Sequence, residues 1–196
     1  MARLIAIEGI DGAGKTTLAR GLARALPELV VLREPGGVEL AERIRELVKD
    51  PALHVDPRAE ALLYAAARAQ LVAEKVVPLL DAGRDVLLDR FVDSSLAYQG
   101  AGRGLGVAEI AALNAFATGG VRADVTLYLR VAPEVGAARR DGKDRLEQAG
   151  DAFFAAVVAA YDALAAEARD RYVVLDGSAR PDEVLAEALA VLKRLQ

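Results

Sequence analysis

The feature that most constrains this sequence is a glycine-rich segment at residues 9–16. It matches the pattern G-x-x-x-x-G-K-[S/T] in full. A short apolar run at residues 4–7 precedes it, and a helical pattern at residues 15–26 follows it. Between a strand and a helix, such a loop directs successive backbone N–H groups at phosphate oxygens, helped by the helix N-terminus. We therefore expect the chain to bind a nucleoside triphosphate.

The residues of this loop have distinct expected roles. Gly12 and Gly14 permit positive φ, Lys15 supplies a cation to the β and γ phosphates, and Thr16 offers a hydroxyl to Mg²⁺. The alternative is a glycine-rich turn that only connects a strand to a helix, which the agreement of motif and context disfavours. The residues predicted to bind the triphosphate are Gly9, Ile10, Asp11, Gly12, Ala13, Gly14, Lys15, Thr16 and Thr17.

Short apolar segments alternate with helical patterns along the rest of the chain. Strands are expected at residues 4–7, 29–32, 85–89, 124–131 and 172–175. Helices are expected at residues 15–26, 39–49, 57–80 with a kink at Pro78, 107–118, 133–140, 150–169 and 181–195. This alternation predicts an α/β, P-loop three-layer αβα fold, in which a five-stranded parallel sheet carries helices on both faces. The length of 196 residues suits a single domain over residues 1–196.

Composition excludes several kinds of site and partner. The sequence has no cysteine, so disulfides, zinc thiolates and cysteine nucleophiles are excluded. Its net charge of −4 argues against a nucleic-acid partner. The most apolar stretch, residues 153–161, is too short to span a bilayer, and no targeting segment is visible. We therefore expect a cytoplasmic protein with no nucleic-acid or membrane partner.

Further motifs accompany the phosphate loop in a definite order. After Ile-Glu-Gly-Ile-Asp-Gly at residues 7–12 come Arg-Glu-Pro-Gly-Gly at 33–37, Asp-Arg-Phe at 89–91, Ser-Ser-Leu-Ala-Tyr-Gln-Gly at 94–100 and Asp-Arg-Leu-Glu at 144–147. Over nearly the whole chain, this set resembles the thymidylate kinase family. One departure is Val38, because the family usually has threonine after the second glycine, so any hydroxyl contact from that position is lost.

The resemblance implies transfer of the γ-phosphate of ATP to dTMP, giving dTDP and ADP for dTTP synthesis. It also implies Mg²⁺ as cofactor, with Thr16 and Asp89 as its protein ligands, and a homodimer. Two rival hypotheses remain open on the sequence. One is another small-molecule kinase on the same fold, which a panel of acceptors would reveal. The other is a nucleotide-switched binding protein, which would hydrolyse the triphosphate slowly and have no acceptor.

The residues expected to bind the acceptor lie partly at strand ends, where open α/β sheets bind ligands. Arg90 can form two parallel hydrogen bonds to a phosphate. Tyr64 and Arg68 lie four residues apart and share one face of a helix. The resemblance places Tyr64 against thymine, Arg68 near a base carbonyl, and Tyr98 and Gln99 at the sugar and base. The predicted substrate-binding residues are Glu34, Pro35, Tyr64, Arg68, Arg90, Ser94, Tyr98 and Gln99.

Each of these assignments has a simpler structural alternative. Residues 33–37 could form an ordinary turn after a strand, and Asp89 and Arg90 could form an internal ion pair. Residues 64 and 68 could be a core tyrosine and a solvated arginine. The glycines at 100, 102, 104 and 106 predict a mobile loop around Arg103, or a flexible connector without function.

A basic segment between residues 136 and 150 is the expected lid over ATP. It contains Arg139, Arg140, Lys143 and Arg145, whereas the phosphate loop contains no arginine. Charge on the transferring phosphoryl group must be neutralised, so at least one of these arginines is expected to act in catalysis. By resemblance this is the bacterial lid-arginine subclass, and the alternative is a solvated charge run. The predicted catalytic residues are Asp11, Lys15, Arg90, Arg139, Arg140 and Arg145.

Overall fold

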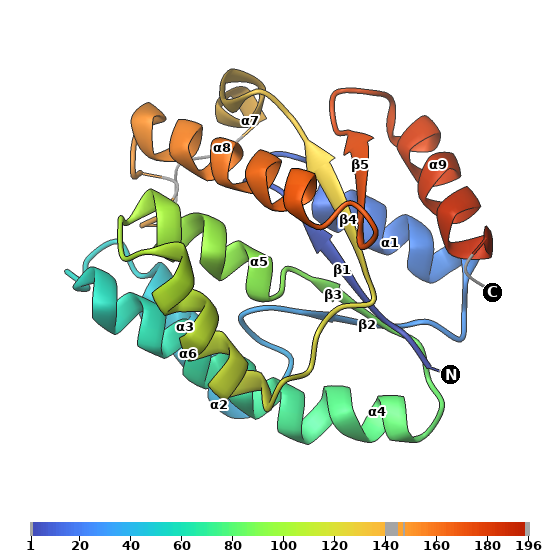
Figure 1. Ribbon diagram of the computed structural model, residues 1–196, viewed down its shortest axis with the longest axis horizontal. Coiled ribbons are helices and arrows are strands. Elements are labelled where there is room, and N and C mark those ends of the chain that lie inside the picture. Colours follow the sequence, from blue (N-terminus) through green and yellow to red (C-terminus); the bar gives the residue numbers. More distant parts are fainter. Residues whose placement is uncertain (1, 140–144, 147, 195–196) are drawn as a thin grey trace.

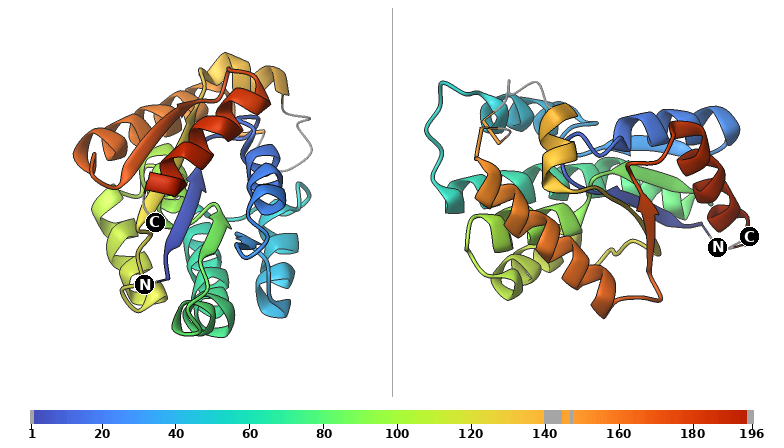
Figure 2. Two further views of the ribbon diagram at one scale, coloured as in Figure 1. Left: turned by 90° about the vertical axis from the view of Figure 1, so that its right-hand side faces the viewer. Right: turned by 90° about the horizontal axis from the view of Figure 1, so that it is seen from above.

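A five-stranded parallel sheet forms the centre of the computed structural model, which describes residues 2–139, 145–146 and 148–194. Within these residues the strand order is β2-β3-β1-β4-β5. Helices cover both faces of the sheet (Figures 1 and 2). The predicted α/β class with a parallel five-stranded sheet is therefore confirmed. The strands are β1 (Leu4–Glu8), β2 (Val30–Arg33), β3 (Val86–Asp89), β4 (Val125–Arg130) and β5 (Tyr172–Asp176).

The helices lie close to the predicted positions. Asp56 caps the third helix as expected, because its Oδ1 accepts the backbone N–H of Arg58 at 2.8 Å. No helix in the described ranges is both long and apolar enough to cross a membrane. The helices are α1 (Lys15–Ala25), α2 (Glu39–Lys49), α3 (Pro57–Leu71), α4 (Val77–Asp81), α5 (Val92–Ser95), α6 (Val107–Thr118), α7 (Pro133–Arg139), α8 (Asp151–Glu167) and α9 (Pro181–Arg194), with π-helical segments η1 (Val72–Val76) and η2 (Leu96–Gly102).

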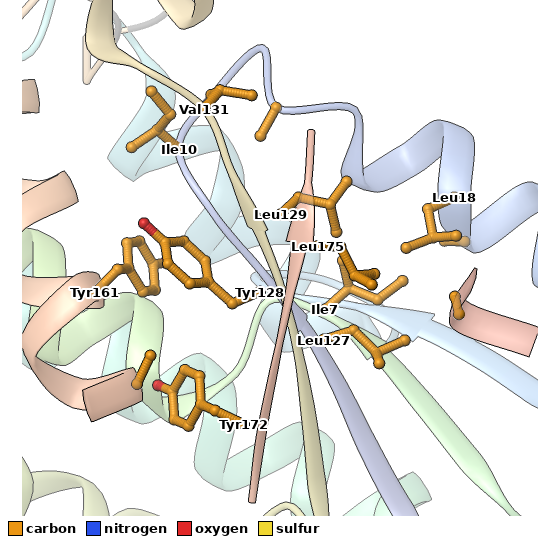
Figure 3. Close-up of a cluster of buried hydrophobic side chains, with 14 of the residues drawn as sticks. Ile7, Ile10, Leu18, Leu127, Tyr128, Leu129, Val131, Tyr161, Tyr172 and Leu175 are labelled. Atoms are coloured by element: carbon orange, nitrogen blue, oxygen red, sulfur yellow. The ribbon is translucent and has the colours of Figure 1, made fainter. Parts of the chain in front are cut away.

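Alternation along the strands divides the core between the two faces of the sheet. Figure 3 shows Leu127 and Leu129 of β4 pointing toward Leu18 of α1, while Tyr128 points the other way. On that second face the ring of Tyr128 stacks on Tyr161 of α8, with centroids 5.1 Å apart. Burial of both faces explains why the strands read as nearly continuous apolar runs.

The long helix expected at residues 57–80 is interrupted rather than simply bent. It widens into η1 just before Pro78. Proline has no N–H to donate, and its ring crowds the carbonyl of the residue four positions earlier, here Glu74. The π-helical turn accommodates this clash, and the helix then continues as α4.

The prediction of a mobile loop at the glycines around Arg103 is wrong for its first part. Residues Leu96–Gly102 form η2, which packs between α6 and α8. A Cβ at Gly102 would lie 2.6 Å from the ring of Phe153, and one at Gly100 would lie 3.1 Å from the Cα of Val107. These two glycines therefore permit close helix packing, which glycine content alone cannot distinguish from a flexible connector.

Candidate active site

The phosphate loop leaves β1 at Glu8 and enters α1 at Lys15. Gly12 and Gly14 have φ of 84° and 96°, where any side chain would strain the backbone. A Cβ at Gly12 would also lie 2.5 Å from the carbonyl oxygen of Gly136 in α7. Glycine is thus required at this position both by conformation and by contact. The loop keeps the form in which backbone N–H groups and the start of α1 attract a phosphate.

Helix α7 brings a guanidinium to the outer side of this loop. Arg139, the last residue of α7, donates from Nη1 to the carbonyl oxygen of Gly177 at 2.9 Å. The same nitrogen lies 3.4 Å from the carbonyl oxygen of Gly12. The predicted lid arginine at position 139 therefore lies directly beside the phosphate loop.

Lys15 is buried at the start of α1. Its Nζ donates to the carbonyl oxygen of Ile10 at 2.8 Å, so the side chain curls back over the loop. Burial lowers the pKa of Lys15 to about 8, and the positive charge of Arg90 adds to this effect. The negative charges of Asp11 and Asp89 oppose this lowering, and a bound phosphate would add further negative charge beside the ammonium.

Thr16 at the start of α1 and Asp89 at the end of β3 bring two oxygen groups together. The hydroxyl of Thr16 donates to Oδ2 of Asp89 at 3.0 Å. A magnesium ion in a nucleotide site takes one or two protein oxygens and completes its shell with phosphates and water. The pair fits that requirement. The described residues hold no cluster of three or more His, Cys, Asp or Glu for a metal held by protein alone.

Asp11, Arg90 and Tyr98 form a hydrogen-bonded cluster between the phosphate loop and η2. Nη2 of Arg90 donates to Asp11 Oδ1 at 2.5 Å, and the Tyr98 hydroxyl donates to Oδ2 at 2.9 Å. Partial burial would raise the pKa of Asp11, but the charges of Arg90 and Lys15 and these hydrogen bonds outweigh it. The pKa of this carboxyl therefore lies well below its usual range, and Asp11 is an anion at neutral pH.

Glu8 binds residues that adjoin this cluster. It is fully buried at the end of β1 and accepts hydrogen bonds from the N–H of Phe91 at 2.8 Å and the hydroxyl of Tyr161 at 2.8 Å. The hydroxyl of Ser94 donates to it at 2.6 Å. Burial raises the pKa of Glu8 to about 7, and the negative charge of Asp93 adds to the rise.

One cavity of about 970 Å³ runs from the phosphate loop to the residues predicted to bind the acceptor. Such a volume suits small ligands of nucleotide size. Among the described residues of the predicted site, Gly9, Ile10 and Arg145 do not line it. The predicted residues that do are Asp11, Gly12, Ala13, Gly14, Lys15, Thr16, Thr17, Glu34, Pro35, Tyr64, Arg68, Asp89, Arg90, Ser94, Tyr98, Gln99 and Arg139.

Arg68 forms the floor of the acceptor end and is only 2% exposed. It donates to Glu34 Oε2 at 2.7 Å, to Ser95 Oγ at 2.9 Å, to the carbonyl oxygen of Phe91 at 3.0 Å, and to Asn114. With the second contact to Glu34 at 2.6 Å, all five N–H groups have acceptors. A contact to a base carbonyl therefore requires Arg68 to share or release one of them.

Glu34 supplies a free acceptor at the same end. Its Oε1 is buried and has no hydrogen-bond partner among the described residues. Burial raises the pKa of Glu34 against the opposing charge of Arg68. The Glu34–Pro35 peptide is cis. This oxygen can accept a hydrogen bond from a ligand that enters the cavity.

The comparison with known proteins decides the family. The family model described as thymidylate kinase matches residues 7–188. This chain belongs to the thymidylate kinase family. The thymidylate kinase of Lactobacillus delbrueckii subsp. bulgaricus is 46% identical over 200 residues, which cover 96% of this chain and 94% of that protein. The thymidylate kinase of Thermoanaerobacter sp. (strain X514) is 41% identical over 198 residues, or 98% of each chain.

A solved structure supports the same assignment. The crystal structure of thymidylate kinase from Ehrlichia chaffeensis superposes with a TM-score of 0.83 at 30% identity and covers 98% of both chains. The predicted P-loop arrangement and family are thereby confirmed.

Only some of the predicted lid residues are shown to lie at the phosphate loop. Arg139 is beside the loop, while Arg145 points to the acceptor side, where its Nη2 lies 2.6 Å from Glu60 Oε2. Arg140 and Lys143 lie outside the described residues. In this thymidylate kinase family member, Arg139 lies at the phosphate loop and Arg145 does not.

Several residues of the site carried no prediction. Arg45 and Lys49 of α2 line the cavity. Their spacing of four residues puts both on one helix face, and this spacing could have indicated a shared role in the site. Glu60 belongs to the same four-residue series as Tyr64 and Arg68. Glu8 carried no comparable signal, since an acidic residue at the end of a strand is common.

Proposed function

We propose that this chain transfers the γ-phosphate of ATP to dTMP, giving dTDP and ADP. The observation that carries the proposal is a single cavity with a triphosphate loop at one end and a set of aromatic, amide and guanidinium groups at the other. Membership in the thymidylate kinase family supports dTMP as the acceptor. The product would enter dTTP synthesis.

ATP is held by the phosphate loop and the start of α1. Backbone N–H groups around Gly12 and Gly14 receive the phosphates, and Lys15 places its ammonium near the β and γ groups. Thr16 and Asp89 are the residues that would hold Mg²⁺. When bound, Mg²⁺ neutralises charge on the β and γ oxygens.

The acceptor occupies the other end of the cavity. Arg90 offers its guanidinium to the monophosphate, and Tyr64 offers a ring face to the base. Tyr98 is held in place by its ring contacts with Phe153 and Phe154, whose centroids lie 5.9 Å and 6.3 Å from its own. A ring this fixed can exclude a ribose 2′-hydroxyl by contact.

Transfer needs no strong general base. The attacking oxygen of the dTMP phosphate is already anionic near neutral pH. It forms a bond to the γ-phosphorus while the bond from that phosphorus to the β–γ bridging oxygen breaks, and ADP leaves. Lys15, Arg90 and Arg139 neutralise the transferring group, and Asp11 holds Arg90 in position.

The test is the stoichiometry of the purified protein with ATP, Mg²⁺ and dTMP. Equal amounts of ADP and dTDP are expected, with little ADP when dTMP is omitted, because the closed site limits water. ADP release that does not depend on dTMP would overturn the proposal and favour a nucleotide hydrolase or switch.

We also propose a homodimer in the cytoplasm. Phe116 of α6 is 88% exposed and Leu62 of α3 is 58% exposed, and these helices pack side by side. A contiguous exposed apolar patch marks a protein–protein interaction site, and we place such a patch across these two helices. The absence of cysteine suits a reducing compartment. Sedimentation velocity tests the dimer, which Phe116→Glu should convert to monomer.

A further inference from the structure

Glu60 is a fully buried carboxylate next to the base end of the cavity. It lies on α3, one turn before Tyr64. Its Oε1 accepts from Gln99 Nε2 at 2.8 Å and from Arg103 Nε at 3.3 Å. Its Oε2 lies 3.1 Å from Arg103 Nη2 and 2.6 Å from Arg145 Nη2.

The two guanidinium groups offset the free-energy cost of burying the Glu60 carboxylate. A buried charge is costly unless it is paired and hydrogen-bonded. Arg103 comes from the end of η2 and Arg145 from beyond α7, so three separate parts of the chain meet at one carboxylate. Both of its oxygens remain acceptors, because a carboxylate in an ion pair has no proton to donate.

This acceptor-only neighbour fixes the orientation of the Gln99 side chain. An amide has one acceptor end and one donor end. Toward a carboxylate, only the NH2 end of Gln99 can form a hydrogen bond, and it does so. Gln99 lines the cavity, so its oxygen is the end left for a bound base.

We infer that Glu60 is a positioning residue that determines base specificity by turning the Gln99 oxygen toward the cavity. The inference rests on the proposed activity toward dTMP. A carbonyl oxygen accepts the N3–H of thymine. Cytosine carries a lone pair at N3, which would face that oxygen without a hydrogen bond. The pocket therefore selects a pyrimidine that carries an N–H at N3. Glu60 brings about this selection through Gln99 and need not touch the base itself.

The decisive comparison uses dTMP and 5-methyl-dCMP, which share the sugar and the 5-methyl group and differ at the base edge. In Glu60→Gln, the new side chain turns its oxygen to the two arginines and its NH2 to Gln99. Gln99 then rotates and presents NH2 to the cavity. The ratio of kcat/KM for dTMP to kcat/KM for 5-methyl-dCMP should fall by at least about tenfold, because a site built for one hydrogen-bond pattern rejects the opposite one.

The matched control is Glu74→Gln. Glu74 accepts a hydrogen bond from Gln70 four residues earlier, which is the same amide–carboxylate pair on an exposed helix surface. This variant should leave both rates unchanged. In a Gln99→Leu background, Glu60→Gln should not change the ratio further, because the amide it orients is gone. A purely structural role for Glu60 would instead lower both rates equally and leave the ratio as it was.

A second measurement addresses the wild-type protein directly, whether or not the variant folds. The side-chain NH2 signal of Gln99, assigned by its loss in Gln99→Leu, should be protected from hydrogen exchange in the free protein, because it is bound to a buried carboxylate. Free exchange of this NH2 with water, or an unchanged ratio in a folded Glu60→Gln, overturns the inference. The rate of the wild-type protein with dTMP is measured separately. It tests the proposed activity independently of the role of Glu60.

Discussion

Arg90 has a φ of 73°, the only positive value outside glycine among the described residues. Such a backbone is unfavourable for arginine and persists only where surrounding contacts enforce it. Here Asp11 holds the guanidinium and Glu8 holds the following N–H of Phe91. The same pairing appears at Arg68 with Glu34 and at Arg103 with Glu60. At the residue scale, carboxylates therefore fix the direction of these three guanidinium groups before any ligand binds.

Replacing Lys15 by methionine should abolish most transfer and leave the fold intact. The side chain is similar in length, but it has no charge to place on the β and γ phosphates. We expect kcat to fall by roughly 10²–10³-fold, as for loss of one preorganised electrostatic group. Coupled ADP release measures the rate, with the melting temperature as the control. Retention of half the wild-type turnover would refute the assignment of the phosphate loop.

Two replacements of Tyr98 separate the function of its ring from that of its hydroxyl. Tyr98→Ala removes the ring and should lower the preference for dTMP over its ribose counterpart by at least about tenfold, since contact exclusion is lost. Tyr98→Phe keeps the ring and loses only the bonds to Asp11 and Arg90. It should preserve the preference while lowering kcat. Specificity constants for the two sugars give the answer, and an unchanged ratio in the alanine variant would show that Tyr98 points elsewhere.

At the scale of elements, the sheet gathers the site at one edge. Ile7 of β1 and Arg33 of β2 both pair with Asp89 of β3, so the carboxyl ends of these strands coincide. Helix α1 begins there, η2 closes the acceptor side, and α7 rests on the phosphate loop. The order of parallel strands reverses at β1, which is where open α/β sheets form their ligand crevice.

The burial of Glu8 at the end of β1 predicts a particular dependence of stability on pH. The pKa of Glu8 is raised from 4.5 to about 7, so the folded state keeps a proton that the unfolded state releases. Between these two values stability falls as pH rises, by up to about 3 kcal/mol, and then levels off. Glu8→Gln should lack this fall. Urea unfolding at pH 5 and pH 7.5 tests it, and an equal pH dependence in the variant and the wild type would contradict the account.

The position of α7 predicts which lid arginine matters most. Arg139→Ala should lower kcat by roughly 10³-fold or more, the effect of an arginine on a transferring phosphoryl group, with a smaller effect on ATP binding. Arg145→Ala should change kcat less, because its guanidinium faces Glu60 and not the phosphate loop. If Arg139→Ala keeps kcat within about tenfold, a loss of roughly 1.4 kcal/mol, then Arg139 is not the catalytic cation.

Local signals were enough to predict most elements and half of the cavity lining. Periodicity gave α2 with its observed bounds, and the phosphate loop came from a contiguous motif. The π-helical segments were missed because their widening depends on Pro78 and on packing around Gly102. The role of Glu60 was not predictable, since its partners Gln99 and Arg103 lie 39 and 43 residues away in the sequence.

At the scale of the whole molecule, one cavity joins two chemically different ends. The phosphate end consists of backbone N–H groups, Lys15 and Arg139. Any nucleoside triphosphate offers the phosphate oxygens that these groups bind. The acceptor end consists of buried side chains in fixed orientations, including Arg68, Tyr98 and Gln99. We therefore predict that selectivity for the acceptor comes from the second end.

The most direct test of the account is an acceptor panel assayed with ATP and Mg²⁺. The purified protein would be offered dTMP, CMP, AMP and GMP at equal concentrations, with ADP and diphosphate products both measured. We predict the highest kcat/KM for dTMP, by at least about 10²-fold, because hydrogen-bonding sites reject wrong groups far better than apolar pockets. A higher kcat/KM for CMP or AMP than for dTMP would contradict the account.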